Sequence, residues 1–243
     1  MTKNLVKFFI QLFVIVLLYY LFAEYGLSYL FAILAAVVFV AFIIFNQGKS
    51  RNKEIYLEVG CDAQRYLDTL EKLHRETDNQ NVYRLSRAYG LIYKGQIDEA
   101  RILFQDVHFD EIAKKEKYEP IYLRTKAKLA YEAGDQATLK AMLDELALAE
   151  DPKEHYEITK DYLRILTLLL QERYEEAIAI LVETIPAQHR RVHIVELEYY
   201  LAYAYYKDGR IEDAVAVTEF IVKKGYRVFY SDLCYELYEK IKY

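Results

Sequence analysis

The chain has 243 residues, and its 37 acidic and 32 basic side chains give a formal net charge of −5. No basic stripe runs along the sequence, which argues against nucleic acid as a partner because contact with a phosphate backbone needs clustered Lys and Arg. Cys61 and Cys234 lie far apart and form no Cys-x-x-Cys pair. The sequence therefore predicts two small buried thiols rather than a disulfide framework or a zinc ribbon.

Apolar residues almost fill the first 46 positions, whereas charged residues recur every few positions after them. Residues 8–23 and 27–45 contain no charged side chain. A helix rises about 1.5 Å per residue, so the second run covers roughly 28 Å, close to the thickness of the hydrocarbon core. We predict two transmembrane spans, at about residues 5–23 and 27–45, with Lys7 reaching to the membrane surface.

Only Glu24, Tyr25 and Gly26 separate the two predicted spans, so residues 1–46 should form an antiparallel helical hairpin. Cations flank the outer ends of the two spans, whereas the link carries none. These cations are Lys3, Lys7, Lys49, Arg51 and Lys53. Because positive residues stay on the cytoplasmic side, we predict a multi-pass protein of the cell membrane with both termini and the remaining chain in the cytoplasm.

Two other interpretations of the N-terminal segment stay open. The first is a signal peptide cleaved near Ala23, but Leu21 stands where the signal needs a small residue, and a second apolar run follows at once. The second is a re-entrant pair of helices that does not cross the bilayer. It would leave the remaining chain on the same side of the membrane.

Beyond a polar linker at residues 47–61, four segments of the chain align with one another without gaps. They are residues 88–104, 127–143, 165–181 and 202–218. In each segment an apolar pattern of helical period runs up to a turn, and a second amphipathic run begins directly after it. The turn positions are Gly95, Gly134, Glu172 and Gly209. The pattern predicts four helix hairpins.

These hairpins resemble the tetratricopeptide repeat family, because small residues recur at matching positions on both sides of each turn. The positions are Ala88, Ala127 and Ala202 in the first helices and Ala100, Ala177 and Ala214 in the second. Small side chains let paired helices approach closely. The resemblance implies an all-α fold in which residues 62–226 form a tetratricopeptide-like α-solenoid.

The chain also departs from the family pattern. Its turn positions follow one another after 39, 38 and 37 residues, against a family period of about 34. Glu172 replaces a glycine, Leu139 and Ile165 replace small residues, and the family's tryptophan is missing. These departures leave the architecture in place and put the subfamily in doubt.

Flanking helices are predicted at both ends of the repeats. Asp62 can cap a helix that runs to about His74 and serves as the second half of an incomplete leading repeat. Residues 227–243 contain a final amphipathic helix that should cover the open end of the stack, as solenoids require. Pro120, Pro152 and Pro186 all lie between hairpins, where one helix stops.

The sequence offers little that points to catalysis. It has no phosphate-binding loop and no nucleophile motif. His189, His193 and Glu196 share one face of a helix, as metal ligands can, but Arg190 and Arg191 beside them would repel a cation. Other carboxylates are expected in the first turns of helices, where they complement the helix dipole. We predict no catalytic residue, no metal and no cofactor; a metal-dependent hydrolase at the two histidines is the enzyme alternative.

Tyrosine is frequent, with 25 residues against 12 Phe and no Trp. On the family's register, tyrosines and two cations occupy the groove-facing positions of successive first helices. These positions are Tyr89, Arg124, Lys128, Tyr131, Tyr162, Tyr199, Tyr203 and Tyr206. Such side chains suit an extended peptide, because they offer a large contact area at low entropic cost. The alternative is that these tyrosines simply pack between helices.

These features predict a non-catalytic scaffold that is anchored in the membrane and recruits a protein or peptide partner to its cytoplasmic groove. A second hypothesis makes the membrane hairpin the working part, in an accessory subunit of a transport, secretion or envelope-synthesis complex. Small residues would then contact other membrane spans. They are Ala32, Ala35, Ala36 and Ala41.

Overall fold

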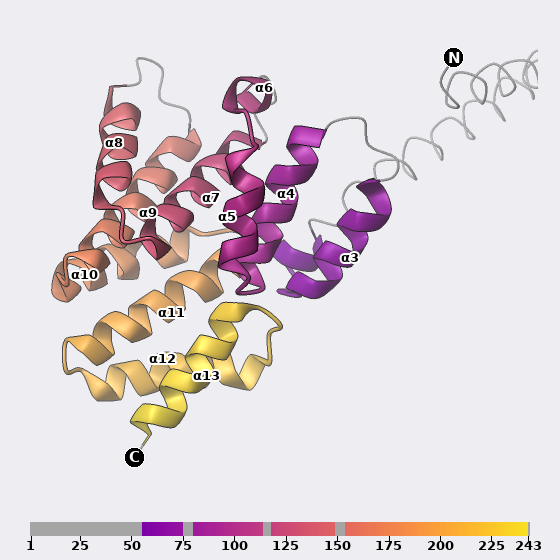
Figure 1. Ribbon diagram of the computed structural model, residues 1–243. Coiled ribbons are helices and arrows are strands. Elements are labelled where there is room, and N and C mark those ends of the chain that lie inside the picture. The colour runs from indigo at the N-terminus through magenta and orange to yellow at the C-terminus, as the bar shows by residue number, and fades with distance from the viewer. Residues whose placement is uncertain (1–54, 75–79, 114–117, 149–153, 243) are drawn as a thin grey trace, which may run out of the picture. The chain divides into compact units, whose positions relative to one another are not determined.

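A computed structural model of the chain describes residues 55–74, 80–113, 118–148 and 154–242 (Figure 1). The chain divides into two units at residue 52, and the described residues all belong to the second unit. The predicted spans at 5–23 and 27–45 lie outside the described residues. Within the described ranges, no helix has the length and apolar character needed to cross a bilayer.

The described part of the chain is helical and contains no strand, which confirms the predicted all-α class. A 3-10 helix, η2 (Ile185–Ala187), joins two of the α-helices. The α-helices are α3 (Ala63–His74), α4 (Gln80–Tyr93), α5 (Ile97–Gln105), α6 (Phe109–Ala113), α7 (Glu119–Glu132), α8 (Gln136–Ala147), α9 (Glu154–Leu170), α10 (Tyr174–Thr184), α11 (Arg191–Lys207), α12 (Ile211–Lys224) and α13 (Phe229–Ile241).

Four helix hairpins form where the sequence predicts them: α4–α5, α7–α8, α9–α10 and α11–α12. Their turn residues all have left-handed backbone, with φ of 82° at Gly95, 67° at Gly134, 57° at Glu172 and 82° at Gly209. The residue after each turn donates its N–H to a carbonyl five residues earlier, as Gln96 does to Leu91 at 2.9 Å and Arg173 does to Leu168 at 3.0 Å. This arrangement is a Schellman C-cap, which favours glycine at the left-handed position. Glu172 adopts it without being glycine.

Small residues occupy the helix crossings, as predicted. The six alanines that match the family pattern are fully buried. Where the pattern is broken, the partner helix still supplies an alanine: Leu139 shares a buried cluster with Ala127, and Ile165 shares it with Ala177. Each crossing therefore keeps at least one small side chain, and a larger one on the opposite helix can fill the remaining space.

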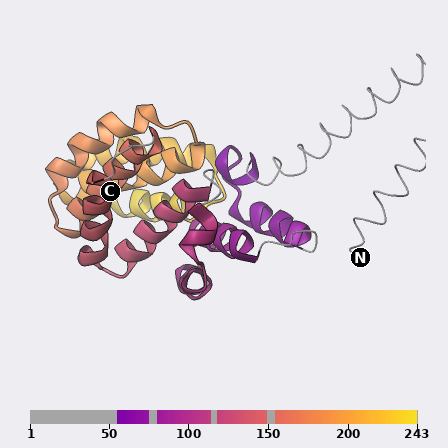
Figure 2. The same cartoon turned by 90° about the horizontal axis from the view of Figure 1, so that it is seen from above.

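The two ends of the described unit meet. Helix α13 packs against α12 and α11 and also against α4, the first helix of the first hairpin, and Figures 1 and 2 show it beside the start of the array. Arg227 donates its N–H to the carbonyl of Cys61 at 2.8 Å, and Ala63 donates to the carbonyl of Arg227 at 3.2 Å. A Cβ on Gly95 would lie 2.7 Å from the ring of Phe229. We call this junction the seam. Helix α13 therefore covers the last hairpin and also contacts the first one.

Helix α3 packs so closely against α4 that no side chain fits at position 90, which is glycine. A Cβ on Gly90 would lie 2.7 Å from the ring of Tyr66 and 2.8 Å from Leu67. The predicted helix from Asp62 is present, and the Asp62 carboxylate accepts the N–H of Arg65 at 2.9 Å. Both cysteines are free and buried, as predicted.

Candidate functional site

Four helices meet at one carboxylate in the interior. Glu196 of α11 accepts hydrogen bonds from the hydroxyl of Tyr93 on α4 at 2.7 Å and from that of Tyr162 on α9 at 2.7 Å. Nη2 of Arg124, on α7, lies 2.6 Å from the same carboxylate. We call these four residues the Glu196 cluster. They join the first helices of all four hairpins.

The Glu196 cluster carries a buried ion pair. Burial opposes the charge on Glu196, but Arg124 and Lys128 outweigh it and leave the pKa of the carboxyl below its ordinary value. Burial likewise opposes the charge on Arg124, yet Glu196 holds its pKa well above the usual range. The Arg124 guanidinium also stacks on the ring of Tyr162, with its central carbon 3.9 Å from the ring centre. Both charges are therefore retained at neutral pH.

Lys128 occupies the centre of the interior beside this cluster. Its ammonium group lies 4.8 Å from the ring centres of Tyr131 and Tyr200 and 4.9 Å from that of Tyr230. It donates to the Tyr200 hydroxyl and pairs with Glu132 at 2.7 Å. Burial lowers the pKa of Lys128. We call this arrangement the Lys128 cage; its rings and cation fill the middle of the array.

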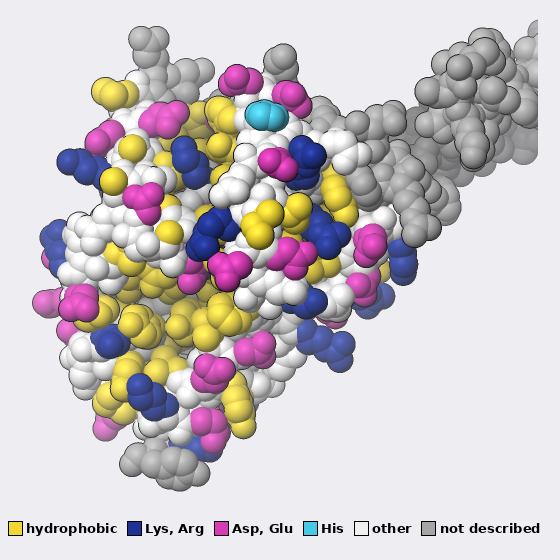
Figure 3. Space-filling view, viewed as in Figure 1, with side chains coloured by type: hydrophobic (Ala, Val, Ile, Leu, Met, Phe, Trp, Pro, Cys, Tyr) yellow, Lys and Arg dark blue, Asp and Glu magenta, His cyan; other side chains and the backbone are white. Residues whose placement is uncertain are grey.

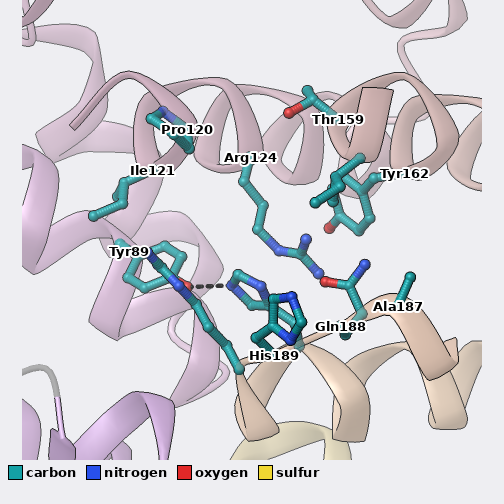
Figure 4. A pocket seen from close by; sticks show the side chains of 12 residues that line it. Tyr89, Pro120, Ile121, Arg124, Thr159, Tyr162, Ala187, Gln188 and His189 are labelled. Carbon is teal, nitrogen blue, oxygen red and sulfur yellow. Dashed lines mark hydrogen bonds between the residues drawn. The ribbon is translucent and has the colours of Figure 1, made fainter. Parts of the chain in front are cut away.

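His193 is held neutral beside the same interior. Its Nε2 lies 2.7 Å from the Tyr89 hydroxyl (dashed line in Figure 4). Burial, together with Arg124 and Arg190, keeps the pKa of His193 well below its ordinary value. The predicted helix face shared by His189, His193 and Glu196 is wrong, because α11 begins at Arg191 and leaves the exposed His189 outside the helix. Glu196 is paired with Arg124, so the three residues form no common metal site. Among the described residues, no group of three His, Cys, Asp or Glu is placed to hold a metal ion.

A cavity of about 180 Å³ opens at the N-terminal ends of α7, α9 and α11 (Figure 4). We call it the Arg124 cavity, because the Arg124 guanidinium lies at its centre in the close view. Aliphatic side chains form part of its wall, and polar groups form the rest. The lining residues are Tyr89, Pro120, Ile121, Arg124, Ile158, Thr159, Tyr162, Ala187, Gln188, His189, Arg190 and His193.

A second hollow, of about 270 Å³, lies at the other end of α11, between α11 and α13. We call it the α11–α13 pocket. Its lining residues are Tyr199, Tyr203, Tyr206, Lys207, Leu233, Glu236, Leu237 and Lys240. The Lys207 ammonium lies 5.6 Å from the ring centre of Tyr203, and that of Lys240 lies 4.9 Å from the ring centre of Tyr206. On this face of the molecule, hydrophobic side chains, with tyrosine counted among them, gather over α11 (Figure 3).

The eight residues predicted to line one groove are divided among three places. Three of them line the Arg124 cavity, three line the α11–α13 pocket, and two belong to the Lys128 cage between these hollows. Four of the eight are more than nine-tenths buried: Tyr89, Arg124, Lys128 and Tyr162. A single open groove over all eight is therefore not formed, because the interior side chains fill its middle.

Several residues at the centre were missed from the sequence. Tyr93 and Glu196 complete the cluster, and Tyr200 and Tyr230 complete the cage. In the sequence Glu196 was considered together with His189 and His193 as a possible metal ligand, and it lies in the second turn of α11. A usable signal existed: Glu196 is four residues from both Val192 and Tyr200, which share its helix face and are buried. A carboxylate in the middle of an apolar helix face indicates a buried cation opposite.

The chain was compared with models of protein families, with curated proteins and with solved structures, and no match was found. The ionised side chains of the interior are paired with one another, which suits the maintenance of a fixed structure. The Arg124 cavity and the α11–α13 pocket lie at the two ends of α11, and a third hollow of about 630 Å³ is lined by residues of α8, α9 and α10. Another molecule can be held at these places.

Proposed function

We propose that this protein is a membrane-tethered docking protein whose α11–α13 pocket holds a segment of a protein partner. In this proposal residues 1–46 anchor the chain, and the tetratricopeptide-like helix pairs face the cytoplasm with both termini. The observation that carries the proposal is the row of partly exposed tyrosines at the pocket, Tyr199, Tyr203 and Tyr206, one helical turn apart on α11.

The chemistry of the pocket favours a partner segment with an apolar side chain next to a carboxylate. Leu233 and Leu237 of α13 offer an aliphatic surface opposite the tyrosines. Rigid aromatic rings supply contact area with little loss of side-chain entropy. Lys207 and Lys240 lie at the same pocket and can pair with an acidic group. An interface of this kind is centred on a few aromatic anchors.

Tethering makes modest affinity sufficient. A partner in the same membrane meets the pocket at an effective concentration set by the linker, which is on the order of millimolar for short flexible linkers. The linker predicted at residues 47–61 provides such a segment in the sequence. A pocket this small can then recruit a partner through a short segment rather than through a large interface.

Crosslinking in living cells tests the proposal. A photo-reactive residue at position 203 or 206 of the full-length chain should capture a discrete partner, and one at Ile102, an exposed residue of α5, should not. Tyr206→Ala combined with a photo-reactive residue at position 203 should weaken the capture. Equal capture from positions 102 and 203 would overturn the assignment of the pocket.

The accessory-subunit hypothesis predicts a different pattern. Crosslinks would then form from the predicted membrane hairpin, for example from Ala35, and Ala35→Leu would disrupt membrane assembly. Position 203 would capture nothing specific. That outcome would transfer the function from the pocket to the N-terminal segment, and the two results cannot be confused because they come from different positions of the same chain.

A further inference from the structure

We infer that the Arg124 cavity is a binding site for a small monocarboxylic acid with a compact apolar body. The site is separate from the α11–α13 pocket, so the inference goes beyond the proposed docking function. It depends on polar groups that are buried at the cavity and have hydrogen-bonding capacity left over.

The first such group is the guanidinium of Arg124. Its Nε and Nη2 atoms donate to Glu196 and Tyr93, whereas its Nη1 atom makes no hydrogen bond with any described residue. Arg124 is only 8% exposed, and it lines the cavity. Among the described residues, Nη1 does not belong to the enclosed polar atoms that lack a hydrogen-bond partner, so water in the cavity reaches it and a ligand acceptor can replace that water. The cavity is the place from which an acceptor can come.

The second group is the side-chain amide of Gln188. It is 91% buried, since its exposure is 9%, and within the described structure it has no hydrogen-bond partner. Figure 4 shows this amide directed into the cavity, with its oxygen on the side of the Arg124 guanidinium and its nitrogen turned away. Rotation about the last side-chain bond brings the two N–H donors to that side, and one acceptor group between Gln188 and Arg124 would then satisfy both residues.

The start of α11 adds a favourable field. The N-cap residue of α11 is Arg190, whose side chain has no acceptor atom and makes no cap hydrogen bond. The first backbone N–H groups of the helix are therefore not capped by that side chain. A helix N-terminus carries a partial positive charge that favours an anion. By itself this end would be no site; with Arg124 and Gln188 beside it, three donors converge on one cavity.

The fixed charges limit the ligand to a single negative charge. Arg124 is already paired with Glu196, and Arg190 is paired with Glu58 at 2.7 Å. The surplus of positive potential is therefore small, and a doubly charged phosphate would lie close to two carboxylates. Neutral His193 adds no charge. A monocarboxylate needs two hydrogen-bond donors and little net charge, which is what the cavity has.

The size and walls of the cavity define the rest of the ligand. Pro120, Ile121, Ile158 and Ala187 form an aliphatic surface beside the donors. A cavity of about 150 Å³ can hold benzene, and this cavity has about 180 Å³. A phenyl ring or a short branched chain therefore fits, with its carboxylate between Arg124 and Gln188.

Phenylacetate is a suitable probe of this site. Calorimetric titration of the full-length protein should show that phenylacetate binds about tenfold or more tightly than phenylacetamide, because only the acid forms charge-assisted hydrogen bonds. Acetate, which has the charge without the ring, and inorganic phosphate should both bind more weakly. Phenylacetate should also raise the thermal unfolding temperature.

Two variants assign the binding to the cavity. Gln188→Leu removes the amide at similar size, and Arg124→Lys keeps a cation for Glu196 but has no Nη1 group; both should weaken phenylacetate binding about tenfold. Ile102→Ala, on the exposed face of α5, should bind as the unaltered protein does. Because Arg124→Lys can also disturb folding, Gln188→Leu decides the test. Equal binding of acid and amide, preference for phosphate, full affinity in Gln188→Leu, or no binding of phenylacetate at millimolar concentration would each overturn the inference.

Discussion

The carboxylate of Glu196 lies 2.6 Å from Nη2 of Arg124, although 72 residues separate the two in the chain. Tyr93 and Tyr162 complete the coordination of this carboxylate, so one side chain of α11 contacts the first helix of every other hairpin. The pair is shielded from water, with Glu196 only 1% exposed. Its main effect is on the relative placement of the helices.

Removing one partner of this pair should be strongly destabilising. Glu196→Gln leaves Arg124 buried without a counter-charge, and we expect a loss of about 3–5 kcal/mol in the free energy of unfolding. Replacing both residues, as Arg124→Met with Glu196→Leu, should recover much of that loss. Denaturant unfolding measures both changes. Glu176→Gln, at an exposed pair with Arg173, is the control and should have little effect; a single variant as stable as this control would contradict the prediction.

His193 should make the protein less stable in mild acid. The folded protein holds His193 neutral because burial, Arg124 and Arg190 lower its pKa, whereas the unfolded chain takes up the proton near pH 6.5. The stabilisation is therefore complete above about pH 6.5 and declines by up to about 1.4 kcal/mol per pH unit as the pH falls through the unfolded-state pKa. In His193→Gln the unfolded chain takes up one proton fewer, so the free energy of unfolding should fall less steeply with decreasing pH. His189→Gln, at an exposed position, should leave it unchanged.

Glu198 should have the opposite effect on the pH dependence of stability, because it stabilises the folded protein in acid. Burial raises the pKa of this carboxyl to about 7 from 4.5. The folded state therefore favours the protonated form, and the resulting stabilisation is present below about pH 4.5 and is lost as the pH rises toward 7. In Glu198→Gln the free energy of unfolding should rise more steeply with pH between 4.5 and 7 than in the unaltered protein. Parallel curves for the two proteins would show that the carboxyl titrates normally.

Replacing the turn residue Glu172 with glycine should make the protein more stable. It is held at φ 57°, where an L side chain is strained, and left-handed backbone costs non-glycine residues roughly 1–2 kcal/mol. Glu172→Gly should therefore stabilise the protein by about 1 kcal/mol. Gly209→Ala is the reciprocal test, because a Cβ there meets nothing within 4 Å and only the backbone strain changes. Thermal unfolding of both variants should shift in opposite directions.

Two tyrosines of the Lys128 cage should respond differently to the loss of their hydroxyls. Among the described residues, the hydroxyl of Tyr230 is buried without a hydrogen-bond partner, whereas that of Tyr200 binds Lys128. An unsatisfied buried polar group costs about 1–3 kcal/mol. Tyr230→Phe should therefore raise the free energy of unfolding, and Tyr200→Phe should lower it. A loss of stability in Tyr230→Phe would mean that its hydroxyl is satisfied in solution.

The proposed topology can be tested with a cysteine at Leu148, which is 81% exposed. Both native thiols are buried, and burial raises the pKa of Cys61 to about 12 and that of Cys234 further still, so they should react slowly. An impermeant maleimide should leave Leu148→Cys unlabelled in intact cells and label it after permeabilisation. Tyr25→Cys, in the predicted outer turn, should show the reverse. Labelling of position 148 in intact cells would place the helical unit outside.

The local features of the fold could be predicted from the sequence. The four hairpins depend on residues within one turn of each other: an apolar helical pattern, a left-handed position and a new amphipathic run. Even Glu172 could be assigned, because its neighbours matched those of Gly95 and Gly209. The short helix α6 was missed, since it is held by the distant Asn81, whose side chain binds Glu111 at 2.7 Å and the backbone of His108.

The candidate site could be predicted only in part, because its arrangement depends on contacts between distant segments. The family register placed Tyr89, Arg124 and Tyr162 near one another, and they do line one cavity. It carried no information on what faces them. Arg124 of the second hairpin pairs with Glu196 of the fourth, and α13 adds Tyr230 from near the end of the chain. The apolar helix face around Glu196 indicates that a buried cation lies opposite, but a single sequence does not identify Arg124 as that cation or Tyr230 as a neighbour of Lys128.

The seam also bears on how such a chain can vary in evolution. An open row of helix pairs can be lengthened or shortened by duplicating or deleting a pair, since each pair contacts only its neighbours. Here Arg227 must meet Cys61 and Ala63, and Phe229 must meet Gly95. An inserted pair would separate those partners. We therefore expect related sequences to keep the number of pairs constant and to diverge instead in the residues that line the Arg124 cavity and the α11–α13 pocket.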